Sequence, residues 1–156
     1  MLEIERKWLI PAPPELNPSS RKAIIQGYLH IADKYSKIRL RQKGDLYFMT
    51  IKGPGELARA EFEIELNKTQ FETLWPATLG HRLEKDRYEI YYNQYTIELD
   101  LFKNQLAGLI IAEVEFASID QANSFIAPNW FGTEVTHDSR YKNRNLTKCE
   151  KIPDPI

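Results

Sequence analysis

The sequence predicts a mainly β protein in which eight antiparallel strands close into a barrel, with a few helices outside it or at its end. Most of the chain alternates between polar and apolar residues with a period of two, which is typical of strands with two different faces. The alternating segments are joined by short connections rich in Pro, Gly and Asn. About eight strands within ~115 residues form a sheet large enough to close on itself.

The strands follow one another with little between them except a proline-rich loop at Pro11–Ser20. Turn residues mark Gly53-Pro54-Gly55 and Asn93-Gln94. The expected strands are Glu3–Leu9, Ala23–Ile31, Lys37–Lys43, Leu46–Lys52, Ala60–Leu66, Leu83–Tyr91, Gln94–Phe102 and Leu109–Phe116. Together they make one domain over residues 1–148, followed by a C-terminal tail over residues 149–156, of which we expect Lys151–Ile156 to be frayed.

Three short helices are expected from capping signals, which are a Ser, Thr, Asp or Asn, in two cases with Glu or Gln three residues later. The first two would pack outside the barrel, and the third could close one end of it. The expected helices are Gln70–Trp75, capped by Thr69 and Glu72 and ended by Pro76, Ile119–Phe125, capped by Ser118 and Gln121, and a last helix through Arg144 and Leu146, capped by Thr136 or Asp138.

Composition excludes several classes of protein. Lys plus Arg is 21 and Asp plus Glu is 22, so the chain lacks the excess positive charge of a protein that holds nucleic acid by bulk charge. Cys149 is the single cysteine, which rules out an internal disulfide and a cysteine metal cluster. No apolar run approaches the ~18 residues of a membrane span, and the charged N-terminus is unlike a secretory signal. We expect a soluble, cytoplasmic protein.

The informative feature is the charge on the polar face of the strands. Residues i and i+2 lie on the same face, roughly 6.5 to 7 Å apart. Solvation explains any one such face, but solvent-facing sheets usually intersperse signs, and here like charges gather within each strand. The pairs are Glu3 and Glu5 followed by Lys7, Arg39 and Arg41, Glu61 and Glu63, Lys85 and Arg87, Glu98 and Asp100, and Glu113 and Glu115, with Lys52 as a single charge.

If these faces all point inward, the barrel encloses a polar channel and its apolar faces point outward, covered by helices and other packing. Acidic pairs favour a divalent cation such as Mg²⁺ or Mn²⁺. Basic pairs favour an oxyanion, and Arg suits bidentate contact with phosphate. The pattern therefore predicts a metal–polyphosphate site. A direct test is that Glu3, Arg39, Glu61, Lys85, Asp100 and Glu113 all point into one lumen.

A series of motifs resembles the CYTH superfamily, the triphosphate tunnel metalloenzymes, across roughly residues 1–146. The motifs are Glu3-x-Glu5-x-Lys7, Gln26-Gly27-Tyr28-Leu29, Ile38-Arg39-Leu40-Arg41, Thr50-Ile51-Lys52, Arg59-x-Glu61-x-Glu63, Glu84-Lys85-x-Arg87-Tyr88, Glu98-x-Asp100, Glu113-x-Glu115 and Arg140-Tyr141-Lys142-Asn143. The resemblance implies an eight-stranded barrel with a hydrophilic tunnel and an enzyme that hydrolyses or cyclises triphosphates with Mg²⁺ or Mn²⁺. The chain is most similar to short, stand-alone bacterial members that act as inorganic tripolyphosphatases, some of which also take nucleotides.

The resemblance also implies roles for individual residues. Glu5, Lys52 and Lys85 are the candidates for direct catalytic roles, and Glu61 and Asp100 are further tunnel acids. The implied metal ligands are Glu3, Glu5, Glu63, Glu113 and Glu115. The implied substrate-binding residues are Lys7, Arg39, Arg41, Lys52, Lys85, Arg87 and Lys142, the last from the C-terminal helix.

Other functions stay open at this point. A class IV adenylate cyclase or a thiamine triphosphatase would use the same tunnel, and a non-catalytic module would bind polyphosphate or a nucleotide without turnover. We expect a small-molecule triphosphate as substrate, tripolyphosphate ahead of ATP, and neither nucleic acid nor membrane as a partner. A homodimer is one of the states that the sequence allows.

Several residues have simpler structural interpretations. Tyr28 is expected to pack with a polar contact. His30 is expected at the surface or the tunnel mouth, and His81 and His137 in solvated loops. Arg59 is either a tunnel residue or only a charge at the start of a strand.

Overall fold

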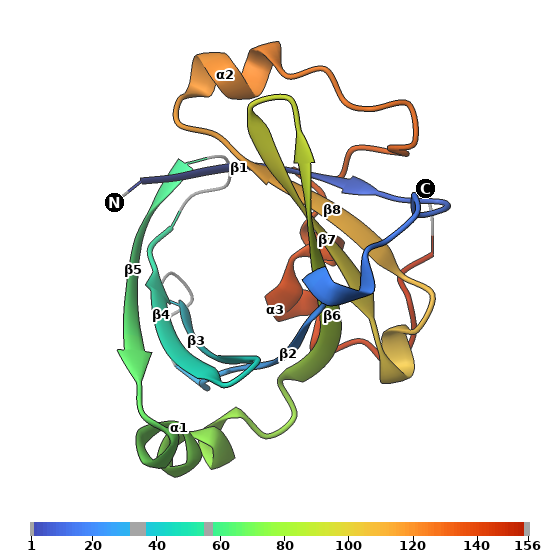
Figure 1. The fold of residues 1–156 in the computed structure, drawn as a ribbon. Coiled ribbons are helices and arrows are strands. Elements are labelled where there is room, and N and C mark those ends of the chain that lie inside the picture. Colours follow the sequence, from blue (N-terminus) through green and yellow to red (C-terminus); the bar gives the residue numbers. More distant parts are fainter. Residues whose placement is uncertain (1, 32–36, 55–57, 155–156) are drawn as a thin grey trace.

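In the computed structural model, which describes residues 2–31, 37–54 and 58–154, eight antiparallel strands close into a barrel (Figure 1). Their order around the barrel is β1-β5-β4-β3-β2-β6-β7-β8, which confirms the predicted fold class. The strands are β1 Leu2–Leu9, β2 Lys22–Tyr28, β3 Lys37–Lys43, β4 Leu46–Lys52, β5 Ala58–Leu66, β6 Arg82–Tyr92, β7 Tyr95–Phe102 and β8 Ile110–Glu115. The third and fourth strands have their predicted bounds, and β2 ends at Tyr28 instead of Ile31.

The pairing register turns the charged faces of the strands toward one interior. Residues directly opposite each other in an antiparallel pair share a face of the sheet. Glu5 lies opposite Glu115, and Lys7 lies opposite Glu113. The same rule places Arg87 of β6 opposite Asp100 of β7. The predicted polar channel therefore follows from the register of the strands.

The main apolar core lies outside the barrel, under α2 (Ile119–Ser124) and the segment after it (Figure 1). Trp8, on the outer face of β1, is buried. Its ring centroid lies 5.4 Å from that of Phe125 and 4.9 Å from that of Phe131. Ser118 caps α2 as predicted, with its side chain accepting a hydrogen bond from the backbone of Gln121. This packing leaves the barrel interior to charged side chains.

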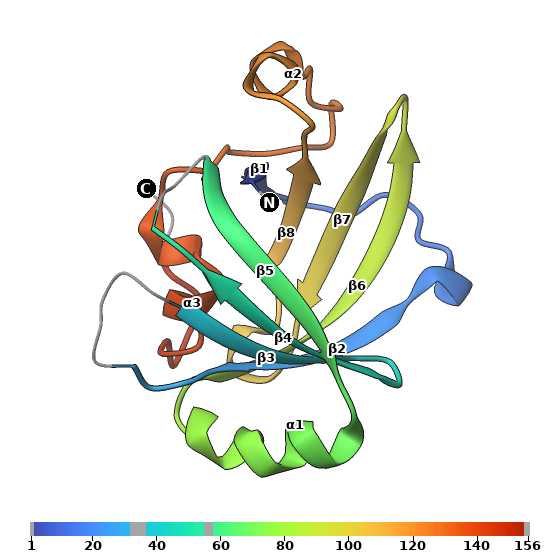
Figure 2. The same ribbon diagram turned by 90° about the vertical axis from the view of Figure 1, so that its left-hand side faces the viewer.

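A second outer layer covers β2, β3 and β4. It consists of α1 (Lys68–Leu74) and the 3-10 turn η2 (Trp75–Thr78), below the barrel in Figure 2. Gly27 of β2 allows the close approach, because a Cβ built on it would lie 2.7 Å from the Cβ of Thr78. The prediction that Thr69 and Glu72 cap this helix was wrong, because Asn67 and Gln70 have the same spacing and exchange both capping hydrogen bonds. Pro76 lies inside η2, where the absence of its N–H does no harm.

An apolar plug fills one end of the barrel, at the left of Figure 2, where α3 (Asn143–Leu146) lies. Leu83, Phe102 and Ile111 point inward there and pack with Tyr141 and Leu146. The last helix is therefore at the predicted place. It is split into the 3-10 turn η4 (Ser139–Tyr141), which Asp138 caps, and α3. The remaining 3-10 turns are η1 Pro18–Ser20 and η3 Asn104–Leu106.

Two expectations about packing need correction. Ile152 and Cys149 pack against the plug, so the described part of the tail, through residue 154, is anchored and not frayed. On β5, Phe62 and Ile64 stay 60% and 47% exposed, so the outer face of this strand is not covered as expected. Within the described part of the chain, no helix has the length and apolar character needed to cross a membrane.

Candidate active site: a charged tunnel

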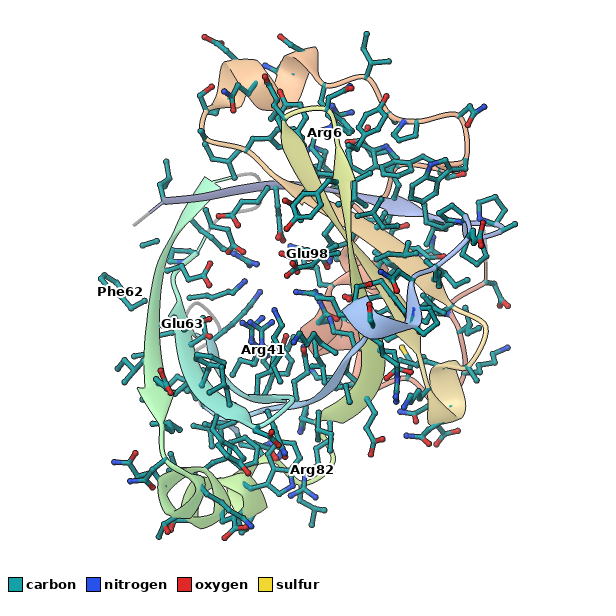
Figure 3. All side chains as sticks on the ribbon, in the orientation of Figure 1. Arg6, Arg41, Phe62, Glu63, Arg82 and Glu98 are labelled. Carbon is teal, nitrogen blue, oxygen red and sulfur yellow. The ribbon has the colours of Figure 1, made fainter. Side chains whose placement is uncertain are left out.

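A cavity of about 340 Å³ lies between the inward faces of the strands, next to the apolar plug at the end of the barrel. In Figure 3, Arg41, Glu63 and Glu98 point into this space, whereas Phe62 points away from it. Of the residues predicted for the site, those that line the cavity are Glu3, Glu5, Lys7, Arg39, Arg41, Lys52, Glu61, Glu63, Lys85, Arg87, Glu113, Glu115 and Lys142. Five of the six residues in the lumen test line it, and Asp100 does not.

Asp100 is instead a buried counter-ion beneath the basic pair of β6. Its carboxylate accepts a 2.6 Å hydrogen bond from the Lys85 ammonium. The Arg87 guanidinium donates to both of its oxygens, at 2.7 and 2.8 Å. Burial alone would raise the pKa of Asp100, but Arg87 and Lys85 lower it below its ordinary value. Asp100 therefore fixes the two cations and is not exposed to a ligand.

Lys85 is almost fully buried, and its ammonium group is charged at neutral pH but loses its proton at a lower pH than an ordinary lysine. Burial lowers the pKa of its ammonium to about 8, against the opposing attraction of Asp100. The ammonium also lies 3.3 Å from the amide oxygen of Asn143 in α3. The helix that plugs the barrel thus helps to hold this lysine in place.

The basic pair of β3 is compensated much less well. Glu63 is the nearest carboxylate, 3.9 Å from Arg39 and 3.7 Å from Arg41, and its side chain is 40% exposed. Thr50 connects Arg39 with Glu63 through hydrogen bonds of 3.1 and 3.2 Å. The Nε atoms of both arginines are buried without a hydrogen-bond partner. Burial, Arg39 and Arg87 lower the pKa of Arg41, so this region of the tunnel favours an anion.

The acidic wall lies across the tunnel, on β1 and β8. Burial and the neighbouring Glu113 raise the pKa of Glu5, and burial and Glu3 raise the pKa of Glu115. Glu113 behaves oppositely: although it too is buried, Lys7 at 3.3 Å holds its pKa well below the ordinary value. Repulsion among these carboxylates means that a cation placed between them would be stabilised.

Besides Lys7, the cations Lys52 and Arg59 contact this wall. The Lys52 ammonium lies 3.0 Å from Glu3 and 3.8 Å from Glu61. The Arg59 guanidinium lies 3.5 Å from Glu3 and 3.9 Å from Glu5. Of the two sequence interpretations of Arg59, the structure supports the tunnel residue.

The acidic wall has the carboxylate ligands that a divalent metal ion needs, but these side chains do not converge on one point in this structure. Carboxylate oxygens are the ligands that Mg²⁺ and Mn²⁺ prefer. A cation there would relieve the repulsion that raises the pKa of Glu5 and Glu115. Among the described residues, no three acidic, His or Cys side chains already converge as a metal cluster. Binding would therefore require the glutamates to exchange Lys52 and Arg59 for the metal.

Several tunnel residues were missed from the sequence because they carry no charge or do not belong to a like-charged pair. Thr50 is fully buried between Arg39 and Glu63, and its one signal is a position two residues before Lys52 on the same face. Lys37, Asn143 and Arg144 also line the cavity, as does Glu98, which the charge pattern had placed in a pair with Asp100 without giving it a role. Glu98 forms a close ion pair with Arg87. A charge pattern alone cannot rank such positions.

Tyr28 is buried in the tunnel wall, and its hydroxyl accepts a 3.3 Å hydrogen bond from Gln26, in line with the expected polar contact. It also lines a smaller pocket with His30, His81 and Arg144. There, Nε2 of His30 lies 2.9 Å from the carbonyl oxygen of Leu79 and 2.9 Å from Nδ1 of His81. His30 is thus at a tunnel mouth, as expected, and contacts a second histidine.

Comparison with known proteins gives consistent matches along the chain. Residues 1–143 match the family model described as the CYTH domain. The chain is 48% identical over 147 residues to an inorganic triphosphatase of Nitrosomonas europaea, covering 94% of this chain and 97% of that protein. It is 34% identical over 148 residues to an inorganic triphosphatase of Acetivibrio thermocellus, covering 94% and 93%. The crystal structure of the inorganic triphosphatase NE1496 superposes with a TM-score of 0.69 at 47% identity, over 94% of this chain and 95% of that one.

Proposed function

Because this chain belongs to the CYTH family, we propose that it is an inorganic triphosphatase, an enzyme that hydrolyses tripolyphosphate to pyrophosphate and phosphate. Two relatives that bear this name match nearly the full length of the chain. The observation that carries the proposal is the under-compensated pair Arg39 and Arg41, which faces an acidic wall across one tunnel. Phosphoryl transfer asks a protein mainly for such positioning and charge stabilisation.

The basic side chains would bind and align the phosphate chain. Arg39 and Arg41 each have a buried Nε without a partner, which a phosphate oxygen would satisfy. Lys7, Lys52, Lys85, Arg87 and Lys142 line the same cavity and would neutralise the remaining charge. Arg87 is already fixed by Asp100, so it offers a rigid contact, whereas the ion pairs of Arg39 and Arg41 with Glu63 are longer.

Mg²⁺ or Mn²⁺ would be held by Glu3, Glu5, Glu113 and Glu115, which share the acidic wall. Glu63, which the resemblance also implies as a ligand, lies beside Arg39 and Arg41, so its position supports this role less well. When bound, the metal would supply Lewis-acid stabilisation of the charge that develops on the transferred phosphoryl group.

The ionisable side chains of the tunnel can move the protons that hydrolysis requires. A water molecule attacks the terminal phosphorus, the bridging P–O bond breaks, and pyrophosphate leaves. Glu5 lines the cavity and can accept the proton of the attacking water through the carboxylate oxygen that the metal does not use. Lys85, with a pKa of about 8, is charged at neutral pH and can stabilise or protonate the leaving oxygen. Lys52 contacts the acidic wall and lines the cavity, which suits a role in neutralising the substrate as it reacts.

The test is a substrate panel with tripolyphosphate, ATP, thiamine triphosphate and pyrophosphate in Mg²⁺ and in Mn²⁺. ATP replaces one phosphate contact by an uncharged ribose, and a charge-assisted hydrogen bond is worth about 1.5 to 3 kcal/mol. We therefore expect kcat/KM for tripolyphosphate to exceed that for ATP by roughly tenfold or more. An equal or higher value for ATP or thiamine triphosphate would overturn this substrate assignment.

Product analysis separates the alternatives. Cyclic AMP and pyrophosphate from ATP would indicate a cyclase, whereas ADP and phosphate indicate hydrolysis. Calorimetric binding of tripolyphosphate without turnover in either metal would indicate a binding module.

A further inference from the structure

Arg59 contacts the carboxylates of the acidic wall, yet it is not among the residues assigned to phosphate or metal above. It lies in β5 directly opposite Glu3 of β1, so both side chains share the inner face of the barrel. Its guanidinium reaches Glu3 at 3.5 Å and Glu5 at 3.9 Å. The side chain is only 14% exposed, so its charge has little water around it.

These contacts are long compared with those of Arg87, another arginine of the tunnel. Arg87 donates to Asp100 at 2.7 and 2.8 Å, the range of strong charge-assisted hydrogen bonds. Arg59 approaches two carboxylates without a close bidentate pair to either, so it compensates this wall incompletely. An ion held in this way can be exchanged for a better one.

Arg59 also has further cations of the tunnel near it. Lys37, Lys142 and Arg144 line the same cavity as Arg59. Burial first, and then the charges of Arg59, Lys142 and Arg144, lower the pKa of Lys37 to about 8. A phosphate group bound near Lys37 would compete with Glu3 and Glu5 for the Arg59 guanidinium, and Arg geometry suits bidentate phosphate contact.

We propose that Arg59 is an exchangeable counter-cation: it occupies Glu3 and Glu5 in the metal-free protein, leaves them when a divalent cation binds, and then contacts the substrate phosphates. This inference rests on the proposed function and deepens it. It makes Arg59 a residue that couples metal binding to triphosphate binding. By thermodynamic linkage, the factor by which bound metal increases triphosphate affinity equals the factor by which bound triphosphate increases metal affinity.

The experiment compares Mn²⁺ binding to the wild type and to Arg59→Gln by calorimetry, without triphosphate. Because Gln removes the competing charge, we expect Mn²⁺ to bind roughly fivefold more tightly or better, the lower end of ordinary coupling between sites. In Mg²⁺, the non-hydrolysable imidotriphosphate should bind roughly fivefold more weakly to Arg59→Gln, because the released guanidinium is missing. Unchanged or weaker Mn²⁺ binding would overturn the proposal.

Two further variants keep the result interpretable. Arg6→Gln removes an arginine from the outer face of β1, where it pairs with Glu134 at 2.7 Å, and should leave Mn²⁺ affinity unchanged. Arg59→Lys keeps the charge and should bind Mn²⁺ as the wild type does. Arg59→Met is a second neutral variant with the same expected gain in Mn²⁺ affinity, for the case in which the Gln variant does not fold. If the wild type fails to hydrolyse triphosphates, the proposed function fails, but the Mn²⁺ comparison still tests Arg59. Normal hydrolysis with unchanged Mn²⁺ affinity in Arg59→Gln rejects the inference alone.

Discussion

The basic pair of β6 and the basic pair of β3 are nearly the same motif in the sequence, but they differ in the structure. Lys85 and Arg87 share the fully buried Asp100 at 2.6 to 2.8 Å. Within the described residues, Arg39 and Arg41 form ion pairs with the half-exposed Glu63, at the longer distances of 3.7 to 3.9 Å, and their two Nε atoms are unpartnered. The protein itself compensates the charge of the first pair. The second pair has incompletely compensated charge and free hydrogen-bond donors, which a ligand can satisfy.

The acidic wall repeats this difference within a single strand. Glu113 is matched by Lys7, and its pKa is held well below the ordinary value. Glu115, two residues later on the same face, has a raised pKa caused by burial, Glu3 and Glu5. In both cases one group already has a close partner of opposite charge, and the other depends more on a ligand for compensation. A raised carboxylate pKa or an unpartnered polar atom therefore marks the group that needs a ligand better than charge alone.

The largest effect is expected from Asp100→Asn. Removing this carboxylate charge leaves Lys85 and Arg87 as buried cations without their counter-ion. Breaking a buried pair typically costs about 3 to 5 kcal/mol, so the free energy of unfolding in urea should fall by about that much. Glu63→Gln is the control, and it should stay within about 1 kcal/mol of the wild type because its ion pairs are long and half-exposed. Equal losses would show that the two basic pairs are equally part of the framework.

Arg41→Ala should separate binding from stability. Loss of a phosphate clamp worth about 1.5 to 3 kcal/mol should raise KM for tripolyphosphate roughly 10- to 100-fold. The melting temperature should not fall, because the variant also removes repulsion with Arg39 and Arg87. Arg87→Ala, by contrast, leaves the buried Asp100 with Lys85 but without the guanidinium that donates to both of its oxygens, and should lower the melting temperature. Equal melting temperatures of Arg41→Ala and Arg87→Ala would contradict the distinction between the two basic pairs.

Glu115→Gln should reduce the rate by roughly tenfold or more at low Mg²⁺ and recover part of it at high Mg²⁺, because it removes one hard ligand. Glu113→Gln also leaves Lys7 without its carboxylate, so added metal should restore less of its activity. Initial rates over a Mg²⁺ titration measure both. Identical titration curves would remove the distinction between these two glutamates.

The smallest effect concerns Lys37, whose pKa is lowered by burial and then by neighbouring cations to about 8. The unfolded chain binds this proton more tightly, so the folded protein gains stability as pH rises from about 8 toward the ordinary Lys value near 10.4. Lys85, with a pKa of about 8, contributes in the same direction. Lys37→Met should remove only part of the gain, a difference of about 1 to 2 °C in melting temperature between pH 8 and pH 10, because the side chain is partly solvated. If Lys37→Met gains as much stability between pH 8 and pH 10 as the wild type does, the pKa of Lys37 is not lowered in the folded protein.

The sequence was sufficient for the barrel and for its polar interior, because both follow from a period of two. Bounds of β3 and β4 were predicted to the residue, since Gly44 and charged residues mark their turn. The cap of α1 was misplaced because Thr69 and Asn67 both have a partner three residues later. Only three-dimensional packing decides between two such local signals.

The sequence could not predict how deeply each charged side chain is buried in the wall of the tunnel. Asp100 and Glu98 alternate identically, yet Asp100 is fully buried beneath the cations and Glu98 lines the cavity. Arg59 could not be assigned because its partners Glu3 and Glu5 lie more than fifty residues away in another strand. Periodicity states which face a residue takes, but not how far its side chain reaches or what meets it there.

The shortest strand pairing of the described barrel adds a kinetic consequence. Only Leu2–Ile4 of β1 pairs with β5, and from Glu5 onward the same strand pairs with β8. Three residue pairs join β1 and β5, against eight between β6 and β7. Amide hydrogen exchange at Ala58–Ala60 should therefore proceed by local opening, well ahead of exchange in β6 and β7. Because Glu3 and Arg59 lie opposite each other in this short ladder, ligand-dependent protection of those amides would report occupancy of the acidic wall.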